Sequence, residues 1–138
     1  MPRSRRPPEP PPEIFVDRNL GRYLIPDALR TAGYTVHTMF SVYGSGAEER
    51  ITDEEWLERA GSDWIVLTKD EAIRRRPSEQ AAIDRYRVRV FCLTSGGLTG
   101  EEQRDRILAN MNRIVQRCRQ PGPYVCAIYA ERLRQVWP

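Results

Sequence analysis

Short apolar runs alternate with amphipathic stretches along most of this chain of 138 residues. The apolar runs are typical of buried strands, which we expect at 13–17, 34–44, 64–69, 88–94 and 124–130. The amphipathic stretches predict helices at 20–33, 52–61, 78–87 and 99–118. Pro26 predicts a bend or a break in the first of these helices. We expect an exposed loop at 45–50 and assign no helix or strand to the terminal segment 131–137.

Strands that alternate with helices predict a mainly parallel sheet, because right-handed crossovers place helices on both of its faces. We therefore expect an α/β protein with a single domain over residues 14–138. The stretch before it holds too many prolines and charges to pack against a core. We interpret residues 1–13 as a disordered Pro/Arg-rich arm.

Two of the expected strands end on an acid: Asp17 follows "EIFV" and Asp70 follows "WIVLTK". Sites in parallel sheets form outside the carboxyl ends of the strands, so both carboxylates are expected at one rim. If the two strands are neighbours, their ends lie about 5 Å apart. Carboxylates that close raise one another's pKa unless a cation lies between them.

A third acid is expected over the same rim, at the start of the helix that leads into the third strand. Thr52 and Glu55 have the spacing of a capping box, so Asp53 lies in the first turn with Glu54 beside it. Oxygen ligands without histidine suit Mg²⁺ or Mn²⁺ rather than zinc. Such a metal supports phosphoryl transfer, because it activates a water molecule and neutralises charge on the phosphate.

Two of the three acids also have a plainer explanation. Asp53 is favoured by the helix dipole in any case, and Asp70 could cap the helix that follows it. The hypothesis of a metal site therefore depends on the three aspartates taken together.

Three stretches, "FVDRNLGRYLIPDALRTAGYTV", "TDEEWLERAG" and "WIVLTKD", follow one another as in PIN-like domains. Over residues 14–95 the chain most resembles the branch with a first strand of the "FLDENL" type and a later strand of the "vlTrD" type. VapC-type toxins of bacterial toxin–antitoxin modules belong to the wider superfamily. The resemblance implies a three-layer α/β/α sandwich and an endoribonuclease that depends on Mg²⁺ or Mn²⁺. Its catalytic and metal-binding acids would be Asp17, Asp53 and Asp70, and we add Glu54 as a further metal ligand.

The sequence departs from that pattern at two positions. Arg18 stands where the branch often has an acid, and Ala72 replaces an acid that the branch carries two residues after Asp70. The number of metal ions is therefore open. The acid that completes the site is open as well, and the candidates are Glu54, Glu71 and Glu79.

Arginine accounts for 21 of the 22 basic residues, and Lys69 is the only lysine. Guanidinium groups make bidentate contacts with phosphate, although GC-rich codon usage is the plainer explanation. Local ion pairs or a solvated charge run would explain the basic residues near the rim equally well. As substrate-binding candidates for an RNA backbone we take Arg18, Lys69, Arg74 and Arg75.

The composition makes several other chemistries poorly supported. His37 is the only histidine, and none of the three cysteines stands in a CxxC pair, so neither a zinc site nor a histidine base is favoured. We expect Cys92 and Cys126 to be buried. No apolar run approaches the roughly 20 residues that span a bilayer, and no apolar signal core is visible. A cytoplasmic protein without a membrane partner is the expectation.

The leading hypothesis is the toxin of a type II toxin–antitoxin pair. The resemblance implies a small antitoxin protein that blocks the acidic rim, and a homodimer is one possible assembly. One alternative is a PIN-like module with a decayed metal site that binds RNA or a protein. A haloacid-dehalogenase-type phosphatase is the other, but it needs an acid at the position of Asn19.

Overall fold

A six-stranded sheet forms the middle of the computed structural model, which describes residues 10–138 apart from the side chains of residues 47 and 48. Its spatial order is β2-β1-β3-β4-β5-β6. The strands are β1 (Glu13–Val16), β2 (Val36–Thr38), β3 (Trp64–Thr68), β4 (Arg89–Leu93), β5 (Tyr124–Ile128) and β6 (Leu133–Trp137). The first five pair in parallel, and β6 pairs antiparallel with β5.

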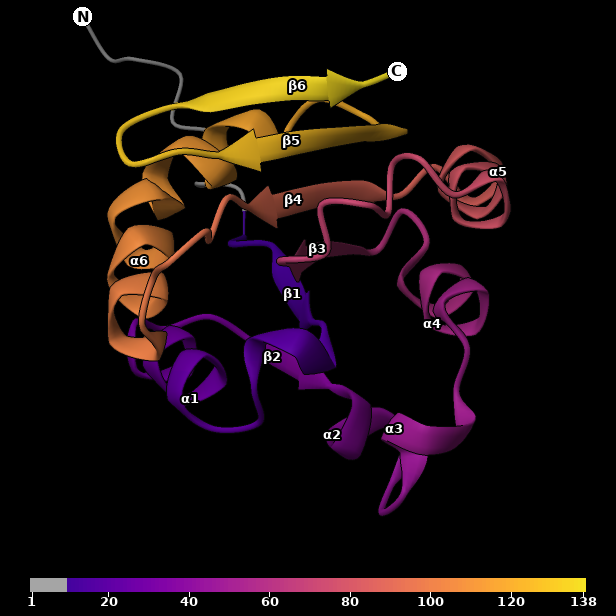
Figure 1. The fold of residues 1–138 in the computed structure, drawn as a ribbon, viewed down its shortest axis with the longest axis horizontal. Coiled ribbons are helices and arrows are strands. Elements are labelled where there is room, and N and C mark those ends of the chain that lie inside the picture. Colours follow the sequence, from indigo (N-terminus) through magenta and orange to yellow (C-terminus); the bar gives the residue numbers. More distant parts are fainter. Residues whose placement is uncertain (1–9) are drawn as a thin grey trace, which may run out of the picture.

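Helices cover both faces of the sheet (Figure 1). On one face lie α1 (Leu24–Thr31) and α6 (Gly100–Arg117), and on the other lie α4 (Asp53–Ala60) and α5 (Pro77–Tyr86). Three short helices occupy connections: η1 (Arg18–Leu20), α2 (Met39–Tyr43) and α3 (Ala47–Arg50). The predicted three-layer α/β/α sandwich with a mainly parallel sheet is confirmed.

Each inner strand contributes side chains to two separate hydrophobic cores, because successive side chains of a strand point to opposite faces. In β1, Ile14 and Val16 join the core under α1 and α6, whereas Phe15 joins the core under α4 and α5. Trp56 and Trp64 belong to the second core, with 0% and 5% of their surface exposed. Burial on both faces explains why these strands are continuous apolar runs in the sequence.

The expected strand at 34–44 is wrong for most of its length. Only Val36–Thr38 forms a strand, and α2 begins at the next residue. Thr38 and Ser41 form a capping box in which the Thr38 hydroxyl accepts from the Ser41 N–H at 3.0 Å and the Ser41 hydroxyl accepts from the Thr38 N–H at 2.7 Å. This local helix start inside an apolar run ends the strand.

The segments expected to lack regular structure also differ from the prediction. The loop at 45–50 contains α3, and the terminal segment at 131–137 contains β6. In β6 the pattern is polar because the strand lies at the sheet edge, where it covers the open side of β5.

The expected helix at 20–33 is divided, as the proline suggested, but the division precedes Pro26. The chain leaves η1 at Gly21, whose φ of 84° favours glycine, and α1 begins at Leu24. Pro26 then lies in the first turn of α1, where its missing N–H leaves no helical hydrogen bond unmade.

Residues 1–9 of the predicted arm lie outside the described residues. Residues 10–12 form neither helix nor strand, and Glu13 already belongs to β1. Within the described residues no helix has both the length and the apolar character needed to cross a membrane. The expected burial of Cys92 and Cys126 is confirmed, and both thiols are free.

Candidate functional site

Strands β1 and β3 are neighbours, so their carboxyl ends lie side by side at the rim where both acids were expected. Val16 pairs with Leu67, and the Asp17 N–H donates to the Leu67 carbonyl at 2.9 Å. The Asp17 side chain is buried, with 5% exposure, and one of its oxygens accepts a hydrogen bond of 2.9 Å from the Thr68 hydroxyl. The strand pairing therefore fixes the first acid at the rim.

Thr68 connects the two strand ends through a single buried hydroxyl. Besides donating to Asp17, this hydroxyl accepts from the Asn19 side-chain amide at 3.0 Å and from the Asp70 N–H at 3.1 Å. The Asn19 carbonyl oxygen accepts in turn from the Lys69 N–H at 3.2 Å. Thr68 and Asn19 were not among the predicted site residues, although both directly neighbour the strand-end motifs in the sequence.

Burial dominates the ionisation of Asp17. It raises the pKa of this carboxyl from 3.8 to about 6, against the lowering effect of the Thr68 hydrogen bond and with a further rise from the charge of Asp53. The Arg18 charge opposes the rise. A group in this environment gains from any additional cation that favours its ionised form.

Asp53 opens α4, and its side chain is oriented by the core. Thr52 and Glu55 form the predicted capping box, with hydrogen bonds of 2.8 and 3.2 Å. The Asp53 carboxylate accepts from the Trp56 indole N–H at 3.0 Å and pairs with Arg18 at 3.6 Å. Burial raises the pKa of Asp53, the Trp56 hydrogen bond lowers it, and the charge of Glu79 raises it again.

Three carboxylates meet around one arginine that the sequence analysis did not single out. The Arg76 Nη1 atom lies 2.6 Å from Asp70, 3.4 Å from Glu79 and 3.9 Å from Asp53. The Nη2 atom adds a second contact of 3.3 Å to Asp70. Glu79 is buried, with 6% exposure, and also accepts from the Ser78 hydroxyl at 2.7 Å. We call Asp17, Asp53, Asp70 and Glu79 the acidic rim.

Of the three candidates for a further acid, the structure brings only Glu79 into this group. Glu54 is exposed and lies in a groove with Ser78 and Arg85. It follows Asp53 in the helix and is therefore turned about 100° away from it around the helix axis. Glu71 is exposed and lines a pocket beside β4 and β5. Glu54 was predicted as a metal ligand, and the structure places it outside the acidic rim.

The four predicted substrate-binding residues lie in different settings. Arg18 is next to the acidic rim through Asp53, and it also donates to the Ile51 carbonyl at 3.4 Å. Lys69 borders a pocket with Asn19 and the start of α6. Arg74 donates to the Val136 carbonyl at 3.3 Å, and Arg75 is exposed.

Neither the histidine nor Cys92 adds a reactive group to the acidic rim. His37 lies in β2 and pairs with Glu13 at 2.9 Å, at the amino end of the parallel strands. Burial raises the pKa of the Cys92 thiol to about 12, which keeps it protonated at neutral pH. Carboxylates are therefore the reactive groups that this rim offers.

The carboxylates of the acidic rim are not arranged as a complete set of metal ligands in this structure. Across the part of the chain that the structure describes, no three His, Cys, Asp or Glu side chains are close enough together to bind a metal ion as they stand. The cation that three of the rim carboxylates surround is the Arg76 guanidinium.

These features define a class of α/β protein: a mainly parallel sheet between helix layers, with a buried acid after one strand and a partly exposed acid after its neighbour. The family described as "PIN like domain" matches residues 12–95. The chain belongs to this PIN-like domain family, which confirms the resemblance found in the sequence. Membership in this family leaves the haloacid-dehalogenase interpretation without support.

A related protein covers nearly the whole chain. It is "Putative ribonuclease VapC45" of Mycobacterium tuberculosis (strain ATCC 25618 / H37Rv), 32% identical over 124 residues, which are 89% of this chain and 90% of that protein. No solved structure matches the chain.

Proposed function

We propose that this protein is a metal-dependent endoribonuclease and the toxin of a type II toxin–antitoxin pair. The observation that carries the proposal is the acidic rim, in which four carboxylates from α4, α5 and the segments directly after β1 and β3 converge. The relationship to a protein whose name describes a ribonuclease supports RNA as the substrate.

The acidic rim suits a hard divalent cation. Its donors are carboxylate oxygens, which Mg²⁺ and Mn²⁺ prefer, and a guanidinium nitrogen already lies among three of them as a bound positive charge. Asp17, Asp53 and Asp70 would hold the metal, with Glu79 as the fourth acid. When bound, the metal supplies an activated water molecule and positive charge for the scissile phosphate.

Neighbouring side chains orient the acids without neutralising them. Thr68 donates to Asp17, and Trp56 donates to Asp53. Both donors are uncharged and buried, so each carboxylate keeps its negative charge in a fixed direction. This preorganisation lowers the entropy that the acids lose when they bind a cation.

Basic residues near the rim would hold the RNA backbone. Arg18 and Lys69 flank Asp17 and Asp70 in the sequence and would bind phosphates next to the cleaved bond, while Arg74 and Arg75 would extend the contact. Phosphate contacts of this kind are independent of the base sequence and weaken as salt rises.

We further propose a protein partner and a cellular location. The cognate antitoxin would be a small protein that covers the acidic rim, and its removal would expose the site. We place the protein in the cytoplasm, where its RNA substrates are, and leave a homodimer as an assembly to be tested by light scattering.

The direct test is cleavage of mixed cellular RNA with Mn²⁺ or Mg²⁺ by the wild type, Asp17→Asn and Asp70→Asn. Asparagine preserves the shape of the side chain but removes the charge of the ligand. We expect cleavage that EDTA abolishes and that both variants lose. His37→Gln, at the opposite end of the strands, is the control and should cleave as the wild type does.

A second candidate is an RNA- or protein-binding domain that has lost catalysis. The ion pairs of Arg76 with three rim carboxylates favour it, because an arginine can neutralise such a cluster permanently. A wild-type protein that cleaves no RNA and binds no Mn²⁺ in calorimetry would support this candidate and overturn the first.

A further inference from the structure

Arg76 is fixed at the acidic rim by the local sequence. It is the N-cap residue of α5, with extended backbone angles (φ −83°, ψ 124°), and Pro77 occupies the first turn. A residue before proline disfavours helical angles, so Pro77 both starts the helix and holds Arg76 extended. From this position its side chain reaches acids on three different segments.

The loop before Arg76 is itself well ordered. The Asp70 carboxylate accepts from the Ala72 N–H at 3.1 Å, and the Ile73 N–H donates to the Asp70 carbonyl at 3.1 Å. Ile73 is buried in the core, with 1% exposure. The backbone that carries Arg76 is therefore anchored on both sides of the arginine.

The arginine neutralises only part of the charge that surrounds it. Asp53, Asp70 and Glu79 bring three negative charges when ionised, whereas Arg76 brings one positive charge and Arg18, which pairs with Asp53 at 3.6 Å, brings another. The remaining charge attracts a further cation. A divalent cation would need the same oxygens, at about 2.0 to 2.6 Å, and a guanidinium within 2.6 Å of Asp70 would then repel it at close range.

The side chain of Arg76 can move into solvent because it is more exposed than those of the three acids. It is 44% exposed, whereas those of Asp53, Asp70 and Glu79 are 23%, 25% and 8% exposed. An arginine can rotate about its flexible stem into solvent without opening the core. Displacement of Arg76 by another cation would therefore need no change in the core that supports the three carboxylates.

We propose that Arg76 is an internal counter-ion of the acidic rim, which a divalent cation displaces when it binds. The arginine acts as a positioning residue: it holds the carboxylates together in the metal-free protein and lowers the affinity for the metal. The inference rests on the proposed metal-dependent function, and it adds the residue that competes with the metal.

The test is Mn²⁺ binding by isothermal titration calorimetry to metal-free protein, with no RNA present. Arg76→Gln removes the charge, Arg76→Lys keeps a cation, and Arg75→Gln removes a neighbouring exposed charge. We expect Arg76→Gln to bind Mn²⁺ about 10-fold more tightly than the wild type, a typical size for coupled binding. Arg76→Lys and Arg75→Gln should stay within about 2-fold of the wild type.

A second readout follows the metal-free protein directly. In EDTA at low salt, Arg76→Gln should melt at a lower temperature than Arg75→Gln, because its carboxylates repel one another without a counter-ion. Saturating Mn²⁺ should then raise the melting temperature of Arg76→Gln more than that of the wild type.

Two results would overturn the inference, and they differ in what else they imply. If the wild type cleaves RNA with Mn²⁺ but Arg76→Gln binds the ion no more tightly, only the role of Arg76 is wrong. If neither protein binds Mn²⁺, the metal-dependent function fails together with the competition between metal and arginine.

Discussion

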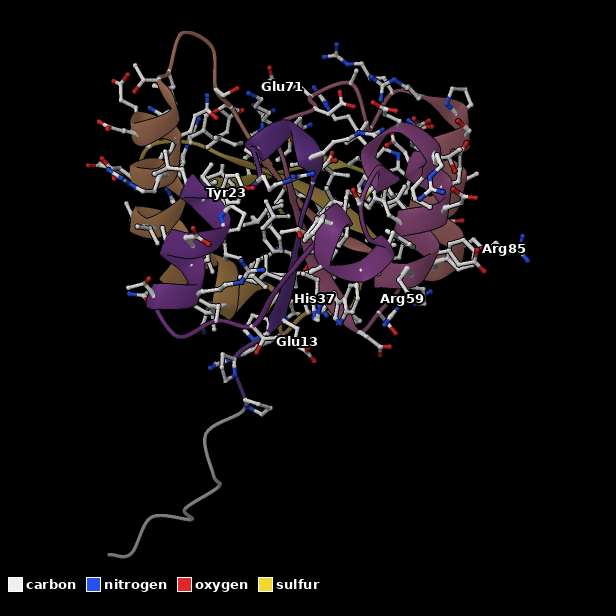
Figure 2. All side chains as sticks on the ribbon, turned by 90° about the horizontal axis from the view of Figure 1, so that it is seen from below. Glu13, Tyr23, His37, Arg59, Glu71 and Arg85 are labelled. Atoms are coloured by element: carbon white, nitrogen blue, oxygen red, sulfur yellow. The ribbon has the colours of Figure 1, made fainter. Side chains whose placement is uncertain are left out.

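Charged side chains gather at both ends of the parallel strands, but they are balanced in different ways. At the amino ends, Glu13 pairs with His37 at 2.9 Å, and the His37 ring stacks on Trp64 with centroids 3.8 Å apart. Arg59 lies over the same Trp64 ring at 4.2 Å. Figure 2 shows Glu13, His37 and Arg59 together on this side, with Glu71 on the opposite side.

At the carboxyl ends, acids outnumber their partners. Four carboxylates share Arg76 and Arg18, and burial raises the pKa of both Asp17 and Asp53. Pairing of unlike groups, as at the amino ends, is typical of stabilising contacts. A surplus of buried like charge is typical of a functional site, because folding alone gains nothing from it.

The largest difference between the two ends should appear in catalysis. We expect Asp53→Asn to lower the rate of RNA cleavage roughly 10³-fold, because the carboxylate charge that would hold the metal is lost while the contact with Trp56 is preserved. Glu13→Gln, which removes an acid at the amino ends, should cleave within about 2-fold of the wild type. Initial rates on one RNA substrate at saturating Mn²⁺ would measure both, and equal losses would end the functional distinction between the two ends.

The next effect concerns the hydroxyl that joins the two strand ends. Thr68→Val should lower the free energy of unfolding by roughly 2 to 3 kcal/mol, because its partners Asp17 and Asn19 and the Asp70 N–H each lose a hydrogen bond in a buried place. Thr68→Ser, which keeps the hydroxyl, is the control and should lose only about 1 kcal/mol. Urea denaturation monitored by tryptophan fluorescence would measure both, and a larger loss from Thr68→Ser than from Thr68→Val would show that the methyl group, rather than the hydroxyl, stabilises the rim.

A third prediction uses the pH dependence of stability. The pKa of Asp17 is about 6 in the folded protein and 3.8 in the reference state, so the folded protein binds the extra proton between these values. The contribution of this carboxyl to the free energy of unfolding is therefore fully present below pH 3.8 and is lost as the pH rises through about 6. Asp17→Asn should stabilise the metal-free protein by about 2 kcal/mol at pH 8, and the gain should vanish near pH 3.8.

Chemical denaturation across this pH range would measure the effect of Asp17→Asn. Glu13→Gln at the amino ends is the control, since Glu13 is exposed and should change stability by less than about 0.5 kcal/mol at any pH. A gain from Asp17→Asn that is the same at both pH values would contradict the role of burial.

The smallest effect concerns RNA affinity. Arg75→Gln should weaken the binding of single-stranded RNA about 2- to 3-fold in EDTA and lower the slope of log affinity against log salt by about 0.7, as expected for one phosphate contact. Arg59→Gln, which removes the same charge at the amino ends, should change neither quantity. Fluorescence anisotropy with a labelled RNA would measure both variants.

The sequence was sufficient to predict the main framework of the site. Asp17 and Asp70 could be placed at one rim because apolar runs predict parallel strands, and parallel strands open their carboxyl ends on the same side. Asp53 could be placed because Thr52 and Glu55 define a helix start within four residues. Both inferences use local patterns or a general rule of topology.

The fourth acid and its counter-ion could not be predicted in this way. Whether Glu71 or Glu79 joins the rim depends on the path of the loop after β3, which the burial of Ile73 and the start of α5 determine. Arg76 is one of three consecutive arginines in the sequence, and only the extended backbone before Pro77 distinguishes it. Such choices depend on contacts between segments rather than on periodicity.

Arg74 links the loop after β3 to a strand that the ribosome makes much later. Its guanidinium donates to the Val136 carbonyl in β6, so this loop is attached to a strand that lies more than 50 residues beyond it in the chain. A ribosome makes all four acids of the rim before it makes β6. The nascent chain thus carries the complete set of acids before Arg74 can make its hydrogen bond to β6.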